Sequence, residues 1–88
     1  MGFFYVLRSE LDYSLYFGST DNLKRRFKEH NEGRSKYTKN KRPWKLIYYE
    51  ACLNKEDAKR REKYFKKTQG RRLLKRRLKE YFYSKSNK

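Results

Sequence analysis

Residues 15–31, LYFGSTDNLKRRFKEHN, contain the change of pattern that decides the fold. Alternating side chains give way after Gly18 to a spacing near four, which predicts the end of a strand, a tight turn and a basic helix. Thr20 or Asp21 can cap the first amides of that helix. The stretch therefore predicts a strand-turn-helix unit.

Three side chains of this unit are the first candidates for chemistry. Arg26 and His30 are four residues apart, so both leave the expected helix from one face. Tyr16 lies on the preceding strand. Each residue alone has a more ordinary explanation: a solvated cation for Arg26, a surface or cap histidine for His30, and a packed strand residue for the tyrosine.

The rest of the chain predicts a single α+β domain over residues 1–83, followed by a frayed tail at 84–88. A three-stranded antiparallel sheet flanked by helices is expected, in the order strand, strand, helix, strand, helix, helix. The expected strands are 3–9, 14–18 and 45–50. The expected helices are 21–32, a helix capped by Asn54 that runs to Lys67 and is stopped by Gly70, and a last helix 71–82.

The short link between the first two strands favours a hairpin and suggests its register. If Leu7 lies opposite Tyr16, then Tyr5 lies opposite Gly18, and the two tyrosines share a face of the sheet. Gly18 would then leave open space beside the ring of Tyr5 for a substrate.

The composition favours a polyanionic partner. The formal net charge is +16, from 26 Lys and Arg against 10 Asp and Glu. Nucleic acid fits such a chain best, whereas no apolar run approaches the length of about 20 residues that crosses a membrane. A single cysteine, Cys52, excludes an internal disulfide and a cysteine-based zinc site. With no signal peptide at the start, we expect a cytoplasmic protein.

Glu62 is a carboxylate inside the buried stripe of its helix, which is costly unless it is paired or binds a metal. An ion pair with Arg61 or Lys66 is the simpler explanation. The alternative is a ligand for Mg²⁺, which one or two carboxylates, waters and substrate phosphates satisfy.

A polar basic loop follows the first helix, and Pro43 and Trp44 end it. Its cations, with those near it, predict a rim that contacts phosphates without reading sequence. The residues of this rim are Arg25, Arg34, Lys36, Lys39, Lys41 and Arg42.

Five ordered blocks resemble the GIY-YIG nuclease superfamily in its small, single-domain form. The segments 3–5 (FFY) and 16–18 (YFG) resemble the two signature triplets. Residues 22–31 resemble the family's helix, and 42–48 and 58–62 resemble its later blocks. Phe3 in place of the leading glycine and Phe17 in place of the central isoleucine depart from the pattern, but neither removes a functional group.

The resemblance implies a divalent-metal-dependent endonuclease that hydrolyses DNA, or RNA, with weak sequence specificity or a preference for particular structures. Tyr5 or Tyr16 would help activate the attacking water, and Arg26 would steady the scissile phosphate. His30 would orient the site, and Glu62 would hold one Mg²⁺ or Mn²⁺ ion. A tyrosine is a poor base unless a nearby cation lowers its pKa, and Arg26 and the metal are the expected sources.

Two other functions fit the same composition. The chain could be a basic nucleic-acid-binding protein that kept the fold and lost turnover. It could also be an accessory subunit of a DNA repair or RNA-processing assembly, with the last helix as its docking surface. The set Tyr5, Tyr16, Arg26, His30 and Glu62 favours the nuclease.

Overall fold

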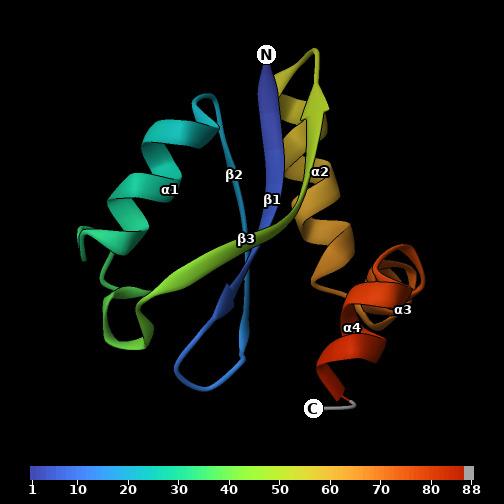
Figure 1. Ribbon diagram of the computed structural model, residues 1–88. Coiled ribbons are helices and arrows are strands. Elements are labelled where there is room, and N and C mark those ends of the chain that lie inside the picture. Colours follow the sequence, from blue (N-terminus) through green and yellow to red (C-terminus); the bar gives the residue numbers. More distant parts are fainter. Residues whose placement is uncertain (87–88) are drawn as a thin grey trace.

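Three antiparallel strands form one sheet in the computed structural model, which describes residues 1–86 (Figure 1). They are β1 (Gly2–Ser9), β2 (Leu15–Thr20) and β3 (Trp44–Cys52), and their order in the sheet is β2-β1-β3. The central strand β1 is almost entirely buried, whereas β2 is an edge strand. The α+β class and the three-stranded sheet predicted from the sequence are confirmed.

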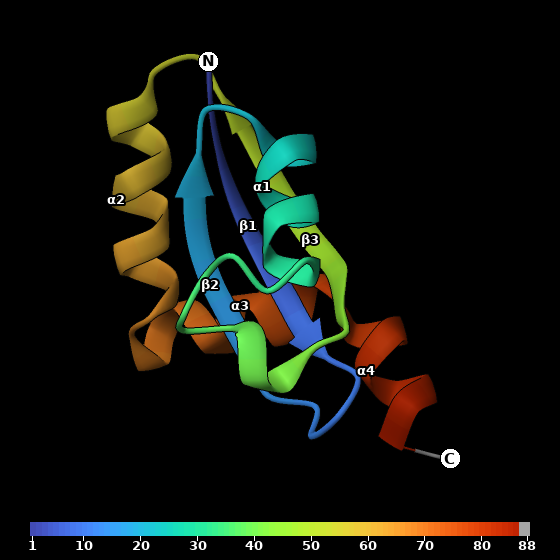
Figure 2. The same cartoon turned by 90° about the vertical axis from the view of Figure 1, so that its left-hand side faces the viewer.

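Helices cover both faces of this sheet. The helix α1 (Leu23–Asn31) lies on one face, and α2 (Lys55–Phe65), α3 (Thr68–Arg77) and α4 (Lys79–Ser86) lie on the other (Figures 1 and 2). A short 3-10 helix, η1 (Lys39–Lys41), interrupts the basic loop. None of the helices in the described part of the chain has the length and apolar character that a membrane span requires.

Alternation along β1 builds two separate cores. Phe4 and Val6 point toward α2 and α3, where they pack with Phe65 and Leu74. Side chains of the opposite set point toward α1, where Tyr5 and Leu7 pack with Trp44 and with partly buried residues. Aromatic rings supply much of both cores, which compensates for the low aliphatic content of the chain.

The register of the hairpin is the predicted one. Leu7 lies opposite Tyr16, and Tyr5 lies opposite Gly18. The rings of Tyr5 and Tyr16 are consequently neighbours, with their centroids 6.3 Å apart.

The start of α1 corrects one expectation. Neither Thr20 nor Asp21 is the N-cap; Asn22 is, and its side chain accepts a hydrogen bond of 3.1 Å from the Arg25 amide. At the other end, Gly33 adopts a positive φ of 81°, the left-handed conformation expected of a glycine after a helix.

The end of α2 corrects a second expectation, because Gly70 does not stop this helix. The helix ends at Phe65, and Gly70 lies inside α3. A Cβ at position 70 would collide with the backbone of Tyr64 and Phe65. This glycine is therefore needed where α3 approaches the end of α2, and not for an unusual backbone angle.

The last predicted helix, 71–82, is two helices in the structure. The chain turns at Leu78, the C-cap of α3, and continues as α4 to Ser86. Residues 84–86 of the expected tail thus belong to α4, and residues 87 and 88 lie outside the described part of the chain. Asn54 is the N-cap of α2 as expected, although its side chain makes no capping hydrogen bond.

Candidate active site

A buried chain of hydrogen bonds joins β1, α1 and the basic loop. The Tyr5 hydroxyl lies 2.8 Å from Nε2 of His30, and Nδ1 of His30 lies 2.8 Å from the Thr38 hydroxyl. The Thr38 hydroxyl in turn lies 3.5 Å from the Ser35 carbonyl, to which it donates. Because the Thr38 hydroxyl donates its proton to Ser35, its oxygen accepts a hydrogen bond from Nδ1–H of His30. Nε2 of the neutral ring then carries no proton, so it accepts a hydrogen bond from the Tyr5 hydroxyl.

His30 is neutral in this environment. The residue is fully buried, so the interpretation as a surface or cap histidine is wrong. Burial, with a smaller contribution from the Arg26 charge, lowers its pKa to about 4. At neutral pH the ring can therefore accept a hydrogen bond from the Tyr5 hydroxyl.

Tyr5 is the less suitable of the two tyrosines for a general base. Its side chain is 1% exposed, and burial raises its pKa, helped by the charge of an ionised Tyr16. Arg26 lowers the pKa, as expected, but by less than burial raises it. The phenol thus stays protonated, contrary to the expected activation by the arginine.

Gly18 does not leave open space beside Tyr5, as the hairpin had suggested. The phenol end of Tyr5 lies across this glycine, and a Cβ there would be 2.5 Å from the hydroxyl oxygen and 3.1 Å from the ring of Tyr16. The glycine is instead what allows the two rings to lie against the edge strand.

Tyr16 lies at the accessible side of the buried hydrogen bonds that join Tyr5, His30 and Thr38. Its ring is half-buried, and it contacts the ring of His30 edge-on at a centroid distance of 5.0 Å. Trp44 packs against another part of the ring at 6.2 Å. The loop beside it is anchored by the Trp44 Nε1–H, which donates to the Thr38 carbonyl at 2.8 Å. Tyr16 is therefore both reachable by a substrate and held in place.

Arg26 and Glu62 come to the same site from different helices. The Arg26 guanidinium donates to Glu29 at 3.1 Å and also acts on the Tyr5 hydroxyl. The negative charge of Glu62, on α2, contributes to raising the Tyr5 pKa. The structure thus brings all five predicted site residues, Tyr5, Tyr16, Arg26, His30 and Glu62, into one neighbourhood around Tyr5.

Glu62 is paired with a cation in the structure. Its carboxylate accepts a hydrogen bond of 2.8 Å from Nζ of Lys66, and 22% of its side chain is exposed. The other candidate partner, Arg61, binds Glu50 instead. The ion pair expected from the sequence is confirmed, but a half-exposed lysine can be displaced, so the carboxylate is accessible to another cation.

A cavity of about 550 Å³ runs along the edge strand beside Tyr16. Leu15, Tyr16 and Phe17 line it together, and because successive strand side chains point to opposite faces, the cavity wraps around the edge of the sheet. Two cations, Lys66 and Arg71, line its other side. Sequence reasoning missed Arg71, because nothing in the sequence distinguishes this arginine from its basic neighbours.

Thr38 is a second residue that sequence reasoning missed. It is fully buried in a polar loop, where it holds both His30 and Trp44. No sequence signal separates it from the solvated residues around it. The order of the loop follows from these two contacts.

The six residues of the predicted phosphate rim all have exposed side chains. Five lie on the loop, whereas Arg25 lies in the first turn of α1, at the other end of that helix. Three of them are paired with carboxylates: Arg25 with Asp21 and Glu29, Arg34 with Glu32, and Lys41 with Asp12. The other three make different contacts. Lys36 lies over the ring of Tyr37, Arg42 donates to the carbonyl of Lys39, and Lys39 itself projects from η1.

Known proteins resemble this chain over most of its length. It is 47% identical over 68 residues to the UPF0213 protein CPE1444 of Clostridium perfringens, which covers 76% of this chain and 72% of that protein. It is 42% identical over 77 residues to the UPF0213 protein in the ldhD 5′ region of Pediococcus acidilactici, with coverages of 84% and 79%.

A solved structure and a family model agree with these relatives. The solution NMR structure of the UPF0213 protein BH0048 from Bacillus halodurans matches with a TM-score of 0.51 and 33% identity, over 84% of this chain and 82% of that one. Residues 1–77 match the model of the GIY-YIG catalytic domain. The chain therefore belongs to the GIY-YIG family, a family of nuclease domains that generally use divalent metal ions.

Proposed function

We propose that this protein is a divalent-metal-dependent endonuclease that hydrolyses phosphodiester bonds in DNA. One observation carries the proposal: a half-exposed tyrosine packs against the buried Tyr5, and a guanidinium and a carboxylate from two further elements act electrostatically on the Tyr5 hydroxyl. Such a set supplies a proton acceptor, a phosphate ligand and a metal ligand, which phosphodiester hydrolysis requires.

We assign the role of general base to Tyr16. In this mechanism Tyr16 acts as the phenolate. Its oxygen accepts a proton from the attacking water while the water oxygen bonds to phosphorus, the bond to the leaving oxygen breaks, and that oxygen takes a proton from solvent. Tyr5 is buried and protonated, so its role is to hold the arrangement. The packing of Tyr16 against His30 and Trp44 supports this division, because it fixes the ring without covering the accessible side.

Arg26 would bind the scissile phosphate. A guanidinium offers parallel donors that match two phosphate oxygens, and it retains its charge throughout the reaction. Its bond to Glu29 orients the side chain from within α1 and leaves one third of it exposed. The cations Lys66 and Arg71 along the adjacent cavity would hold the neighbouring phosphates.

The residues present fit one hard divalent cation. Within residues 1–86 no group of three or more His, Cys, Asp or Glu side chains forms a metal cage. The carboxylate of Glu62 can nevertheless hold Mg²⁺ or Mn²⁺ together with waters and substrate phosphate oxygens. When bound there, the ion would stabilise charge on the nonbridging and leaving oxygens.

Nicking of supercoiled plasmid and cleavage of single-stranded, duplex and branched DNA in Mg²⁺ or Mn²⁺ would test the proposal. We expect Glu62→Gln and Tyr16→Phe each to lower the cleavage rate by at least about 100-fold. Glu56→Gln, on the exposed first turn of α2, and Tyr49→Phe, on the exposed part of β3, are matched controls that should cleave normally. Cleavage that survives both site substitutions would contradict the proposed site.

The same variants separate the nuclease from a basic binding protein. A protein without turnover would bind DNA with a steep salt dependence and show no cleavage, and Glu62→Gln would leave its binding unchanged. Cleavage by the wild type that is lost in EDTA excludes this alternative.

A further inference from the structure

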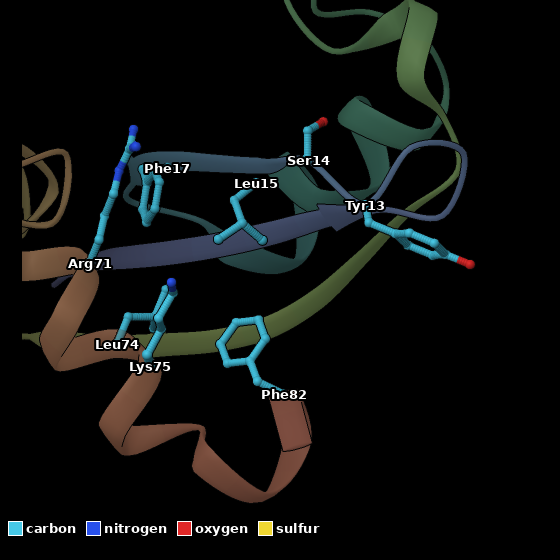
Figure 3. A pocket seen from close by; sticks show the side chains of 8 residues that line it. All are labelled: Tyr13, Ser14, Leu15, Phe17, Arg71, Leu74, Lys75 and Phe82. Carbon is cyan, nitrogen blue, oxygen red and sulfur yellow. The ribbon is translucent and has the colours of Figure 1, made fainter. Parts of the chain in front are cut away.

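A second pocket, of about 350 Å³, lies next to the cavity at Tyr16. It is formed where the beginning of β2 faces α3 and α4 (Figure 3). Leu15 and Phe17 face Leu74 and Phe82 across it, and Arg71 and Tyr13 lie at its opposite ends. The pocket takes no part in the hydrolysis described above.

The lining of this pocket combines an apolar floor with a cationic rim. Phe17 and Leu74 are buried, whereas the ring of Phe82 is half-exposed and can meet a ligand. Arg71 and Lys75 have exposed side chains, and in the described part of the chain neither forms an ion pair with a carboxylate. A ligand that suits such a site has a flat apolar part and a negative charge beside it.

The pocket is continuous with the candidate active site. Leu15, Phe17 and Arg71 line both this pocket and the cavity at Tyr16. The Arg71 guanidinium lies 5.9 Å from the centre of the Phe17 ring, at the junction of the two spaces. A strand of nucleic acid bound at Tyr16 would therefore pass Arg71 before it reaches Phe82.

We propose that this pocket binds one unpaired nucleobase next to the scissile phosphate, and that the enzyme acts on single-stranded DNA. The inference rests on the proposed nuclease function. The base would stack on Phe82, and Arg71 and Lys75 would bind the phosphates on either side of it. A volume near the lower end of the range for small ligands, about 300–1,000 Å³, suits one base better than a base pair.

Charge complementarity favours this occupant over an apolar segment of a protein. Burying an apolar peptide in the pocket would also bury Arg71 and Lys75, two cations with no carboxylate partner in the described chain. A nucleotide satisfies both parts of the lining, because its base covers the apolar floor and its phosphate neutralises the rim.

The test is a binding measurement in EDTA, where the metal-dependent reaction cannot proceed. The probe is a short fluorescein-labelled single-stranded oligonucleotide in which one abasic site is moved along the strand, and affinity is followed by fluorescence anisotropy. We expect the abasic site to weaken wild-type binding by about tenfold at one position and by little elsewhere, because stacking of one base is lost. Weakening of similar size at every position would overturn the proposal, as would tighter binding of a duplex of equal length.

The ring of Phe82 is tested by Phe82→Leu, which keeps an apolar side chain and removes the stacking surface. We expect this variant to lose about tenfold in affinity for the intact oligonucleotide and nothing further for the abasic one, as a double-mutant cycle between contacting groups requires. Additive losses would overturn the proposed stacking. Tyr49→Leu is the matched control, since Tyr49 lines a separate cavity with Phe3 and Phe27.

Arg71→Gln tests the rim. A phosphate contact carries no base information, so this variant should weaken the intact and abasic oligonucleotides equally and reduce the salt dependence of binding. Arg72→Gln, an exposed neighbour outside the pocket, is the control and should change neither. Equal effects of the two substitutions would overturn the assignment of Arg71.

The binding and cleavage measurements test the base pocket and the nuclease function separately. Loss of the position-dependent binding pattern while cleavage in Mg²⁺ persists would reject the base pocket alone. A normal binding pattern without cleavage under any divalent ion would reject the nuclease function and leave the pocket as a binding site for single-stranded DNA.

Discussion

The Tyr5 hydroxyl and Nε2 of His30, 25 residues apart in the chain, lie 2.8 Å from each other inside the protein. Both side chains are buried, and the low pKa of the histidine keeps it neutral, so its Nε2 accepts a hydrogen bond from the phenol. This pair links the central strand to α1 and places Tyr16 beside it. In the proposed mechanism the only histidine of the chain therefore positions Tyr5 and exchanges no proton with the substrate.

His30 predicts a loss of stability in weak acid. Its pKa is about 4 in the folded protein, below the ordinary value of 6.5, so the unfolded chain binds more protons between these pH values. The contribution of neutral His30 to the free energy of unfolding should therefore be fully present above pH 6.5. The free energy of unfolding should fall by up to about 3 kcal/mol as the pH drops toward 4. Urea unfolding at a series of pH values measures this.

A variant without the imidazole is the control for that measurement. The stability of His30→Gln should be lower at pH 7 but should change little between pH 5.5 and 6.5, because no other type of side chain in the sequence has an ordinary pKa in that window. A variant that keeps the full wild-type pH dependence would show that the effect comes from other groups.

The contact between Thr38 and His30 predicts that one hydroxyl group of the basic loop contributes to both stability and cleavage. Thr38→Val keeps the shape but leaves the Nδ1–H of His30 without its acceptor, which should cost about 1–3 kcal/mol of folding free energy. DNA cleavage should also slow, since His30 no longer holds Tyr5 in one orientation. Thr38→Ser retains the hydroxyl and should restore both properties. Equal losses in the two variants would assign the effect to packing.

Sequence reasoning was accurate where a local pattern determines the structure. The hairpin register followed from alternation and a short link, and it placed Tyr5 and Tyr16 on one face. Spacing by four placed Arg26 and His30 on one face of α1, and both act on Tyr5. These relationships depend on backbone geometry alone, which the residue types reveal.

It failed where a residue's role depends on a distant neighbour. A glycine after a helix and a glycine under a close helix contact look alike in sequence, so Gly70 was assigned to the wrong element. The space above Gly18 is filled because the Tyr5 ring lies over it, which pairing alone does not reveal. Thr38 carried no signal, since its burial results from contacts with α1 and β3.

Gly18 predicts a defect in both stability and activity. In Gly18→Ala the added Cβ would lie 2.6 Å from Cζ of Tyr5, in the middle of the strand pairing, so the ring must move. Overpacking of this kind costs about 1–3 kcal/mol, and the displaced ring would disturb the contact with His30. Ser19→Ala, on the adjacent position of β2, is the control. Thermal unfolding and DNA cleavage of both variants measure the difference, and a fully active Gly18→Ala would contradict the described packing.

Gly70 predicts a result opposite to that of ordinary helix propensity. Replacing a glycine inside a helix by alanine normally stabilises a protein by roughly 0.5–1 kcal/mol. In Gly70→Ala, however, the new methyl group would meet the backbone of Tyr64 and Phe65, which cannot rotate away as a side chain could. We therefore expect a net loss of about 1–3 kcal/mol. Gln69→Ala, at an exposed position of the same helix, should be neutral or stabilising by the propensity rule. If urea unfolding showed Gly70→Ala to be the more stable of the two, α3 would not lie against the end of α2 as described.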